Sequence, residues 1–147
     1  MKKLSFVTIF MLIGFVSVTY AQTLNVNVGE VTYAHSASNT GDMVFNGGTS
    51  LTIEGKTYQL SQISSIKVDD NVVANNTVSV VWSGNTAAVV VAGNIASKLT
   101  IVANGATVSV VQSESLQNEV TYTLSGSSAN GSFFMDGSYK ANFVLNN

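Results

Sequence analysis

The chain has 147 residues, which is about the length of one domain, and it contains no cysteine and no proline. Without cysteine, no disulfide can stabilise the fold, so burial and strand pairing must hold it together. The sequence has no arginine, and its six lysines stand against eight acidic residues. Nucleic acid and anionic membrane surfaces bind clusters of Lys and Arg, so this composition argues against both as partners.

Residues 1–21 have the three parts of a secretory signal peptide. Lys2 and Lys3 are followed by an apolar segment, Leu4–Val18, and the segment ends with the small residue Ala21. We expect cleavage after Ala21, which makes the protein secreted or cell-surface, with no membrane insertion afterwards. An uncleaved anchor is the alternative, but the apolar segment is shorter than the ~20 residues that span a bilayer.

The strongest β signal lies between Thr77 and Val111. Four β-rich runs are separated by small turn-forming residues, and they cover residues 77–82, 86–92, 99–103 and 106–111. This pattern predicts a compact antiparallel unit. The dipeptide Asn104-Gly105 predicts a two-residue type I′ hairpin, which needs a positive φ at both central residues.

The rest of the chain also has strand periodicity. Residues 23–28 alternate polar and apolar side chains, Glu54-Gly55-Lys56 closes a predicted hairpin, and residues 120–125 alternate again. Residues 35–42 have no apolar periodicity and predict a loop. The fold class is therefore all-β, with antiparallel hairpins arranged in sandwich-like modules.

A linker that begins with Asp69-Asp70-Asn71 and closes with Asn75-Asn76 predicts a boundary between two modules. The first is an N-terminal β-hairpin module at residues 22–70, and the second is a β-strand domain at residues 75–147. At this chain length the alternative is that both modules share one core.

Several motifs in the second half resemble a known family. They are Val91-Ala92-Gly93-Asn94-Ile95-Ala96, Leu99-Thr100-Ile101, Gly105-Ala106-Thr107-Val108, Val111-Gln112-Ser113, Glu119-Val120-Thr121-Tyr122-Thr123-Leu124-Ser125-Gly126, Gly131-Ser132-Phe133 and Asp136-Gly137-Ser138-Tyr139-Lys140-Ala141. Together they look like the N-terminal portion of secreted bacterial carbohydrate-binding-domain proteins. The resemblance spans about residues 43–147.

The resemblance implies that residues 139–145 lead into a right-handed parallel β-helix. The sequence stops at Asn147, where such proteins continue with further coils, so we interpret it either as a truncated product or as a small β-sandwich that stands alone. The matching residues belong to strands and turns, so the resemblance carries over no ligand contacts. A terminal strand without a following coil would leave an open edge and allow self-association.

Trp82 is the only tryptophan and the only residue that we single out for carbohydrate binding. It precedes a Ser-Gly-Asn turn, where an indole ring could stack on a sugar. The alternation of the run places it on the same face as Val78 and Val80, which favours core packing instead.

No other residue predicts a metal, a cofactor or a catalytic centre. His35 is the only histidine, and we interpret it as a loop residue. Asp69, Asp70 and Asn71 lack the ligand spacing of a calcium loop, so a solvated turn is the prediction. A Gly-x-Ser-x-Gly motif is absent from the sequence, and no pair of carboxyl groups is predicted to face a cleft. We therefore expect no enzymatic activity.

Two functions follow from the sequence. The first, implied by the resemblance, is a non-catalytic β-domain that binds a polysaccharide or glycan or supports a carbohydrate-binding β-helix. The second is a structural or adhesion module at the cell surface that contacts protein through its sheet edges or through an exposed apolar patch.

Overall fold

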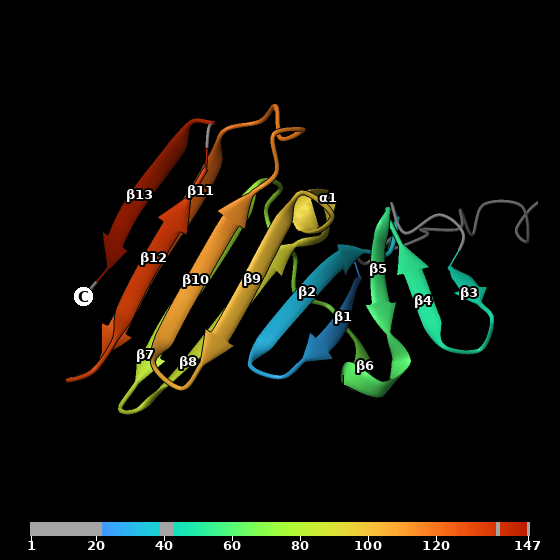
Figure 1. Cartoon of the computed structure of the whole chain (residues 1–147), viewed down its shortest axis with the longest axis horizontal. Coiled ribbons are helices and arrows are strands. Elements are labelled where there is room, and N and C mark those ends of the chain that lie inside the picture. The colour runs from blue at the N-terminus through green and yellow to red at the C-terminus, as the bar shows by residue number, and fades with distance from the viewer. Residues whose placement is uncertain (1–21, 39–42, 138, 147) are drawn as a thin grey trace, which may run out of the picture.

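The computed structural model describes residues 22–38, 43–137 and 139–146, and the predicted signal peptide lies outside them. The described residues form an all-β fold, which confirms the predicted class (Figure 1). None of their helices has the length and apolar character needed to cross a membrane. The strands are β1 Thr23–Val28, β2 Val31–Ser36, β3 Val44–Asn46, β4 Ser50–Ile53, β5 Lys56–Gln59, β6 Ile63–Asp69, β7 Thr77–Ser83, β8 Thr86–Ala92, β9 Leu99–Asn104, β10 Thr107–Gln112, β11 Val120–Ser127, β12 Ser132–Asp136 and β13 Ala141–Asn146. Two short helices join them, η1 Leu60–Gln62 and α1 Gly93–Ala96.

The strands form three sheets. The main sheet has seven strands in the order β13-β11-β7-β8-β2-β1-β6. A facing sheet, β12-β10-β9, lies over the half of the main sheet that contains β7, β8 and β11, and a hairpin sheet, β3-β4-β5, lies towards β1 and β2 (Figure 1). One hydrophobic cluster joins all three sheets and contains Val78 from the main sheet, Val108 from the facing sheet and Leu51 from the hairpin sheet.

The four predicted strands between Thr77 and Val111 are present, but they do not form one antiparallel unit. β7 pairs with β8 and β9 pairs with β10 in antiparallel fashion, and these two hairpins belong to different sheets. The short helix α1, at residues 93–96, connects β8 of the main sheet to β9 of the facing sheet. After β10 the chain alternates between the sheets, so that β11 and β13 pair in parallel, as do β10 and β12.

Two tight turns show how far the turn prediction holds. The β4–β5 hairpin closes at Glu54-Gly55, where φ is positive at both residues, 47° and 76°. In the β9–β10 hairpin the prediction of two positive φ values is wrong, because Asn104 is the last residue of β9 and only Gly105, with a φ of 57°, lies in the left-handed region. Asn104 pairs with Thr107 in the ladder, so the two central residues of the turn are Gly105 and Ala106 rather than Asn104 and Gly105.

Strands from both predicted modules belong to one sheet and one core. β2 pairs in parallel with β8, which joins the strands before residue 70 to those after residue 75. Tyr33 and Leu51 from the first module lie in the same buried cluster as Val91 and Leu99 from the second. The structure therefore has the shared core that was the alternative to two separate modules.

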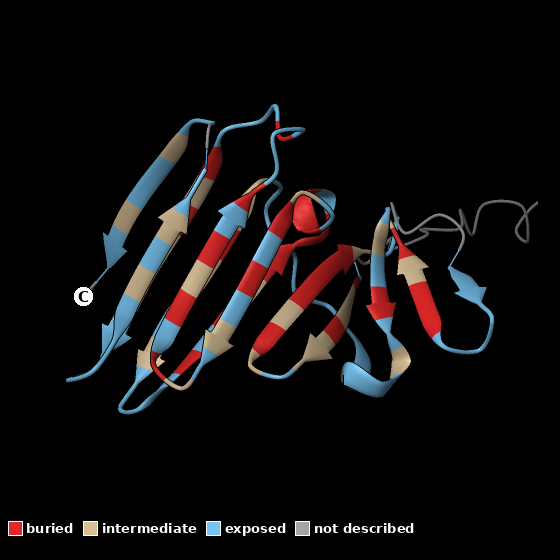
Figure 2. Cartoon of the chain, viewed as in Figure 1, coloured by how far each residue is buried: buried red, intermediate tan, exposed pale blue. Residues whose placement is uncertain are grey.

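The core is built from inward-facing side chains that stack across neighbouring strands. In the main sheet, Val91, Val78, Tyr122 and Phe143 are successive partners on β8, β7, β11 and β13. The rings of Tyr122 and Phe143 stack at a centroid distance of 5.3 Å. Buried residues form stripes across the central strands, whereas β12 and β13 have none (Figure 2).

A buried polar pair lies inside this core. Tyr122 is fully buried, and its hydroxyl accepts a hydrogen bond from Gln112 Nε2 at 3.0 Å. Burial raises the pKa of the Tyr122 hydroxyl, although the Gln112 hydrogen bond opposes this effect. The pair links β11 of the main sheet to β10 of the facing sheet and fixes how the two sheets stack.

Replacing Tyr122 with Phe should lower the free energy of unfolding by about 1–3 kcal/mol, because it leaves the buried Gln112 amide without its acceptor. Urea denaturation of the purified protein measures this change. The control is Tyr139→Phe, because Tyr139 is 40% exposed and its loss of a hydroxyl should change stability by less than about 0.5 kcal/mol. Equal effects of the two substitutions would contradict a structural role for the Gln112–Tyr122 pair.

Candidate saccharide-binding site

Trp82 lies near the end of β7, where the core meets the surface. Val78 and Val80, on the same face of the strand, are fully buried, whereas Trp82 is only partly buried. The indole Nε1–H donates a hydrogen bond to the carbonyl of Ala106 at 2.8 Å. The ring therefore has a fixed orientation while part of it remains accessible. Trp82 thus lies between the two positions that the sequence left open, a side chain packed in the core and one exposed for stacking on a sugar.

Two glycines create the space around the indole. Gly126 pairs with Trp82 across the parallel β7–β11 ladder and has a φ of +84°, and a Cβ there would lie 2.1 Å from the Trp82 carbonyl oxygen. At Gly131 a Cβ would lie 3.0 Å from Cδ1 of the indole and 3.1 Å from its Nε1. Side chains at these two positions would displace the backbone of β7 or cover the ring.

A pocket of about 210 Å³ results beside the ring. Its lining combines two aromatic residues with glycines and serines, namely Trp82, Gly126, Ser128, Gly131, Ser132 and Phe133. None of these side chains is ionisable. An aromatic surface beside neutral hydroxyl groups suits a ligand that has both apolar C–H faces and hydroxyl groups.

The two serines offer complementary hydrogen-bonding atoms. The Ser128 hydroxyl oxygen accepts the Asn130 backbone N–H at 3.2 Å, which leaves its O–H to donate. The Ser132 hydroxyl donates to Thr107 Oγ1 at 3.2 Å, which leaves its oxygen to accept. A ligand hydroxyl, which is both donor and acceptor, can pair with either one.

His35 is not in a loop, so its sequence interpretation is wrong. It lies in β2, is fully buried, and bonds through both ring nitrogens: Nδ1 is 2.7 Å from Glu54 Oε2 and Nε2 is 2.7 Å from the Tyr58 hydroxyl. The β4–β5 turn brings Glu54 to this position. Nineteen residues separate His35 from Glu54, so no local sequence pattern could have revealed the contact.

The protonation of this network follows from burial. Burial of the Tyr58 hydroxyl raises its pKa well above the usual value, and the charges of Tyr33 and Glu54 add to the effect. Tyr58 therefore keeps its proton, and the Tyr58 hydroxyl and the Glu54 carboxylate hold the His35 ring from both sides. This chain of bonds attaches the hairpin sheet to the main sheet.

A second depression, of about 500 Å³, lies beside this network and is lined by Val28, Gly29, Tyr33, Lys56, Thr57, Tyr58, Gln62 and Ile101. The Lys56 Nζ lies 5.0 Å from the centroid of the Tyr33 ring and donates a hydrogen bond to the Leu99 carbonyl at 3.2 Å. Burial lowers the pKa of Lys56. These contacts join β5 to β9, so we assign Lys56 a structural role.

The acidic turn predicted at Asp69 has its oxygens engaged within the protein. Asp69 Oδ2 accepts a hydrogen bond from Asn25 Nδ2 at 2.6 Å, and Oδ1 accepts the backbone N–H of Asn71 at 2.9 Å. In the part of the chain that the structure describes, no three His, Cys, Asp or Glu side chains cluster closely enough to hold a metal ion.

Comparison with known proteins identified no relative. No protein-family model, no curated protein and no solved structure matches the chain. The resemblance to secreted carbohydrate-binding proteins therefore stays a prediction from sequence motifs.

Gly126→Ala should destabilise the protein more than Gly84→Ala. Both glycines have a positive φ, but the Gly84 position has nothing within 4 Å of an added Cβ, so its cost is the left-handed backbone alone, about 1–2 kcal/mol. At Gly126 the added Cβ also collides with Trp82. Chemical denaturation measures both variants, and a similar loss in each would mean that the close approach of β11 to Trp82 is not required.

The Tyr58 network predicts loss of stability in alkali. Below pH 10, the usual tyrosine pKa, Tyr58 is protonated in both the folded and unfolded protein and contributes no pH dependence. Above that pH only the unfolded state releases the proton, so the free energy of unfolding should fall by up to about 1.4 kcal/mol per pH unit from this residue. Tyr58→Phe should reduce that slope, measured by urea denaturation from neutral to strongly alkaline pH; an unchanged slope would contradict the assignment.

Proposed function

We propose that this chain is an exported, non-catalytic β-domain that binds a neutral saccharide through the Trp82 pocket. The observation that carries the proposal is the indole itself, which a hydrogen bond to Ala106 holds in place while part of its surface stays accessible. Stacking a sugar ring on a rigid aromatic side chain costs little conformational entropy on either side. Export is proposed from the signal-peptide pattern of residues 1–21.

The chemistry of the lining favours an uncharged ligand. The pocket residues are aromatic, glycine or serine, so a charged ligand would find no counter-ion among them. Removing the predicted signal peptide leaves four lysines against eight acidic residues, so the mature chain has a net charge of −4. Long-range electrostatics therefore disfavour anionic polysaccharides, and neutral glycans suit both the site and the surface.

A binding role is better supported than a catalytic one. Glycoside hydrolysis needs two carboxyl groups across the bound sugar, and the pocket lining contains none. The hydrogen-bonded group Tyr58–His35–Glu54 contains residue types that are common in catalytic sites, but it lies in the core. The raised pKa of Tyr58 keeps its hydroxyl protonated, which opposes its use as a base.

Strand topology is consistent with the family resemblance. From β10 to β13 the chain passes back and forth between two sheets, so that β10 pairs in parallel with β12, and β11 with β13. Coils of β-solenoids are wound in a similar stacked fashion. We propose on this basis that the last four strands support the pocket in the manner of a solenoid coil.

Retention on immobilised neutral polysaccharides tests the proposal. Protein from Gln22 onward should bind at least one member of a panel in a saturable way, and the free sugar should elute it. Trp82→Ala should lower retention by roughly tenfold or more, because it removes the stacking surface. Trp82→Phe should retain part of the binding.

The matched control is Phe45→Ala, which removes an aromatic side chain that is 65% exposed but lies on β3, outside the pocket. It should bind as the wild type does. Each variant's fold is checked by circular dichroism. No retention of folded wild-type protein on any glycan, or equal retention of folded Trp82→Ala, would overturn the proposal.

A further inference from the structure

One end of the sandwich is formed by the last strands of two sheets, and we call it the open end. β13 ends the main sheet and β12 ends the facing sheet, and both lie at the same end of the molecule (Figure 1). Among the described residues, each strand pairs on one side only, so a row of backbone N–H and C=O groups faces outward from both. Such edges are templates for pairing with another strand.

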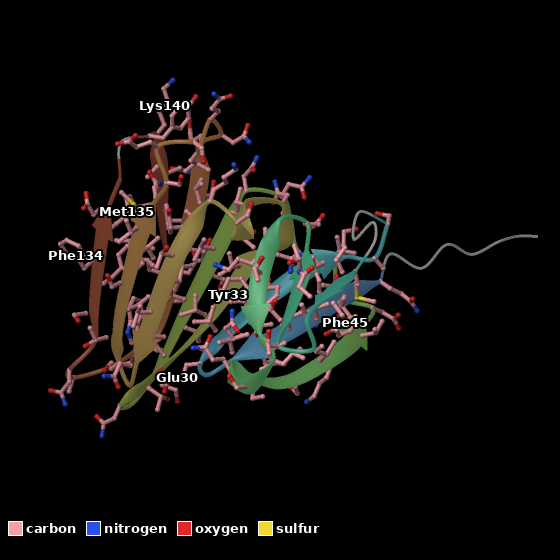
Figure 3. The ribbon with its side chains drawn as sticks, turned by 45° about the vertical axis from the view of Figure 1, so that its right-hand side comes forward. Glu30, Tyr33, Phe45, Phe134, Met135 and Lys140 are labelled. Atoms are coloured by element: carbon pink, nitrogen blue, oxygen red, sulfur yellow. The ribbon has the colours of Figure 1, made fainter. Side chains whose placement is uncertain are left out.

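Large apolar side chains are exposed at this end. Phe134 is 61% exposed, Phe143 46% and Leu145 77%. Phe143 pairs with Tyr122, and Leu145 pairs with Leu124, so both side chains lie on the inward face of the main sheet. They are exposed because no further strand or sheet of the described residues covers the core at this end. Phe134 lies on the outer face of β12 and projects from that edge of the molecule (Figure 3).

The usual protection of sheet edges is missing here. Proteins commonly block an edge with a lysine, a proline or a bulge. β13 contains no charged residue, β12 contains only Asp136 at its end, and the sequence has no proline. The opposite edge of the main sheet, β6, carries Lys67 and Asp69, and its register with β1 shifts at Asn27/Val28.

We infer that a second copy of this chain covers the open end, tail to tail. A two-fold axis perpendicular to the stacked sheets reverses the direction of every strand. It therefore pairs β13 with β13 and β12 with β12 of the second copy, both antiparallel, in one contact. The two main sheets and the two facing sheets become continuous, and the two cores join.

Charge and side-chain pairing favour this partner. In β12, the register that places Phe134 opposite Phe134 also places Phe133 opposite Met135, so apolar residues meet apolar residues on both faces. The same register sets Asp136 opposite Ser132 and keeps the two carboxylates apart. β13 has no charge to repel its copy in any register. Head-to-tail assembly would instead bring this end against the charged residues of β6.

This dimer is a specific form of the second function predicted from the sequence, an adhesion module that contacts protein, and here the contacted protein is a second copy of the chain. The inference does not depend on saccharide binding.

Sedimentation velocity of protein from Gln22 onward should show a monomer–dimer equilibrium that depends on concentration. Leu145→Lys combined with Phe134→Lys places a charge in each open edge and should raise the dissociation constant by roughly tenfold or more. Val68→Lys, on β6 at a position 59% exposed, should leave the equilibrium unchanged.

Cysteine cross-linking tests the register, because the chain has no cysteine of its own. Opposed residues of an antiparallel pair have Cα atoms about 4.5–5.5 Å apart, within disulfide reach. Phe134→Cys should therefore form a covalent dimer under mild oxidation, and Val68→Cys should not. A folded wild type that stays monomeric at every concentration would overturn the inference, as would larger assemblies that Val68→Lys dissolves.

Discussion

The fold depends on stacking apolar side chains in register across strands, because it has no disulfide to rely on. Val91, Val78, Tyr122 and Phe143 form one such row across four strands of the main sheet, and Val108 and Phe133 form part of the facing row. Gln112 reaches from the facing sheet to the hydroxyl of Tyr122 and ties the two rows together. A one-residue slip of any strand would turn its inward set to solvent, so these rows fix the register of the whole sandwich.

The candidate pocket is a consequence of the same register. Parallel pairing sets Gly126 beside Trp82, and the absence of a side chain there lets the two backbones approach while the loop at residues 128–131 passes next to the ring. Ala106, in the tight β9–β10 turn, supplies the carbonyl that orients the indole. Three segments distant in sequence thus define the pocket, and the core rows hold all three in place.

The sequence predicted local features better than long-range ones. Alternation at residues 23–28 and the valine-rich runs near Trp82 located strands well, because side-chain period is a local property. The sequence did not predict the parallel pairing of β11 with β7, because that contact depends on how the connections cross between the sheets. Trp82 was found as a unique aromatic residue, whereas the glycines that shape its pocket and the partners of His35 become visible only when the chain is folded.

Titration of tryptophan fluorescence with a neutral oligosaccharide tests the central claim most directly. Trp82 is the only tryptophan of the chain, so its emission reports on the pocket alone. The account predicts a saturable change in emission, with the same change absent when Gly131→Phe covers the ring in a protein that remains folded. Emission that stays constant with every neutral saccharide that the protein retains on a column would place binding elsewhere and contradict the account.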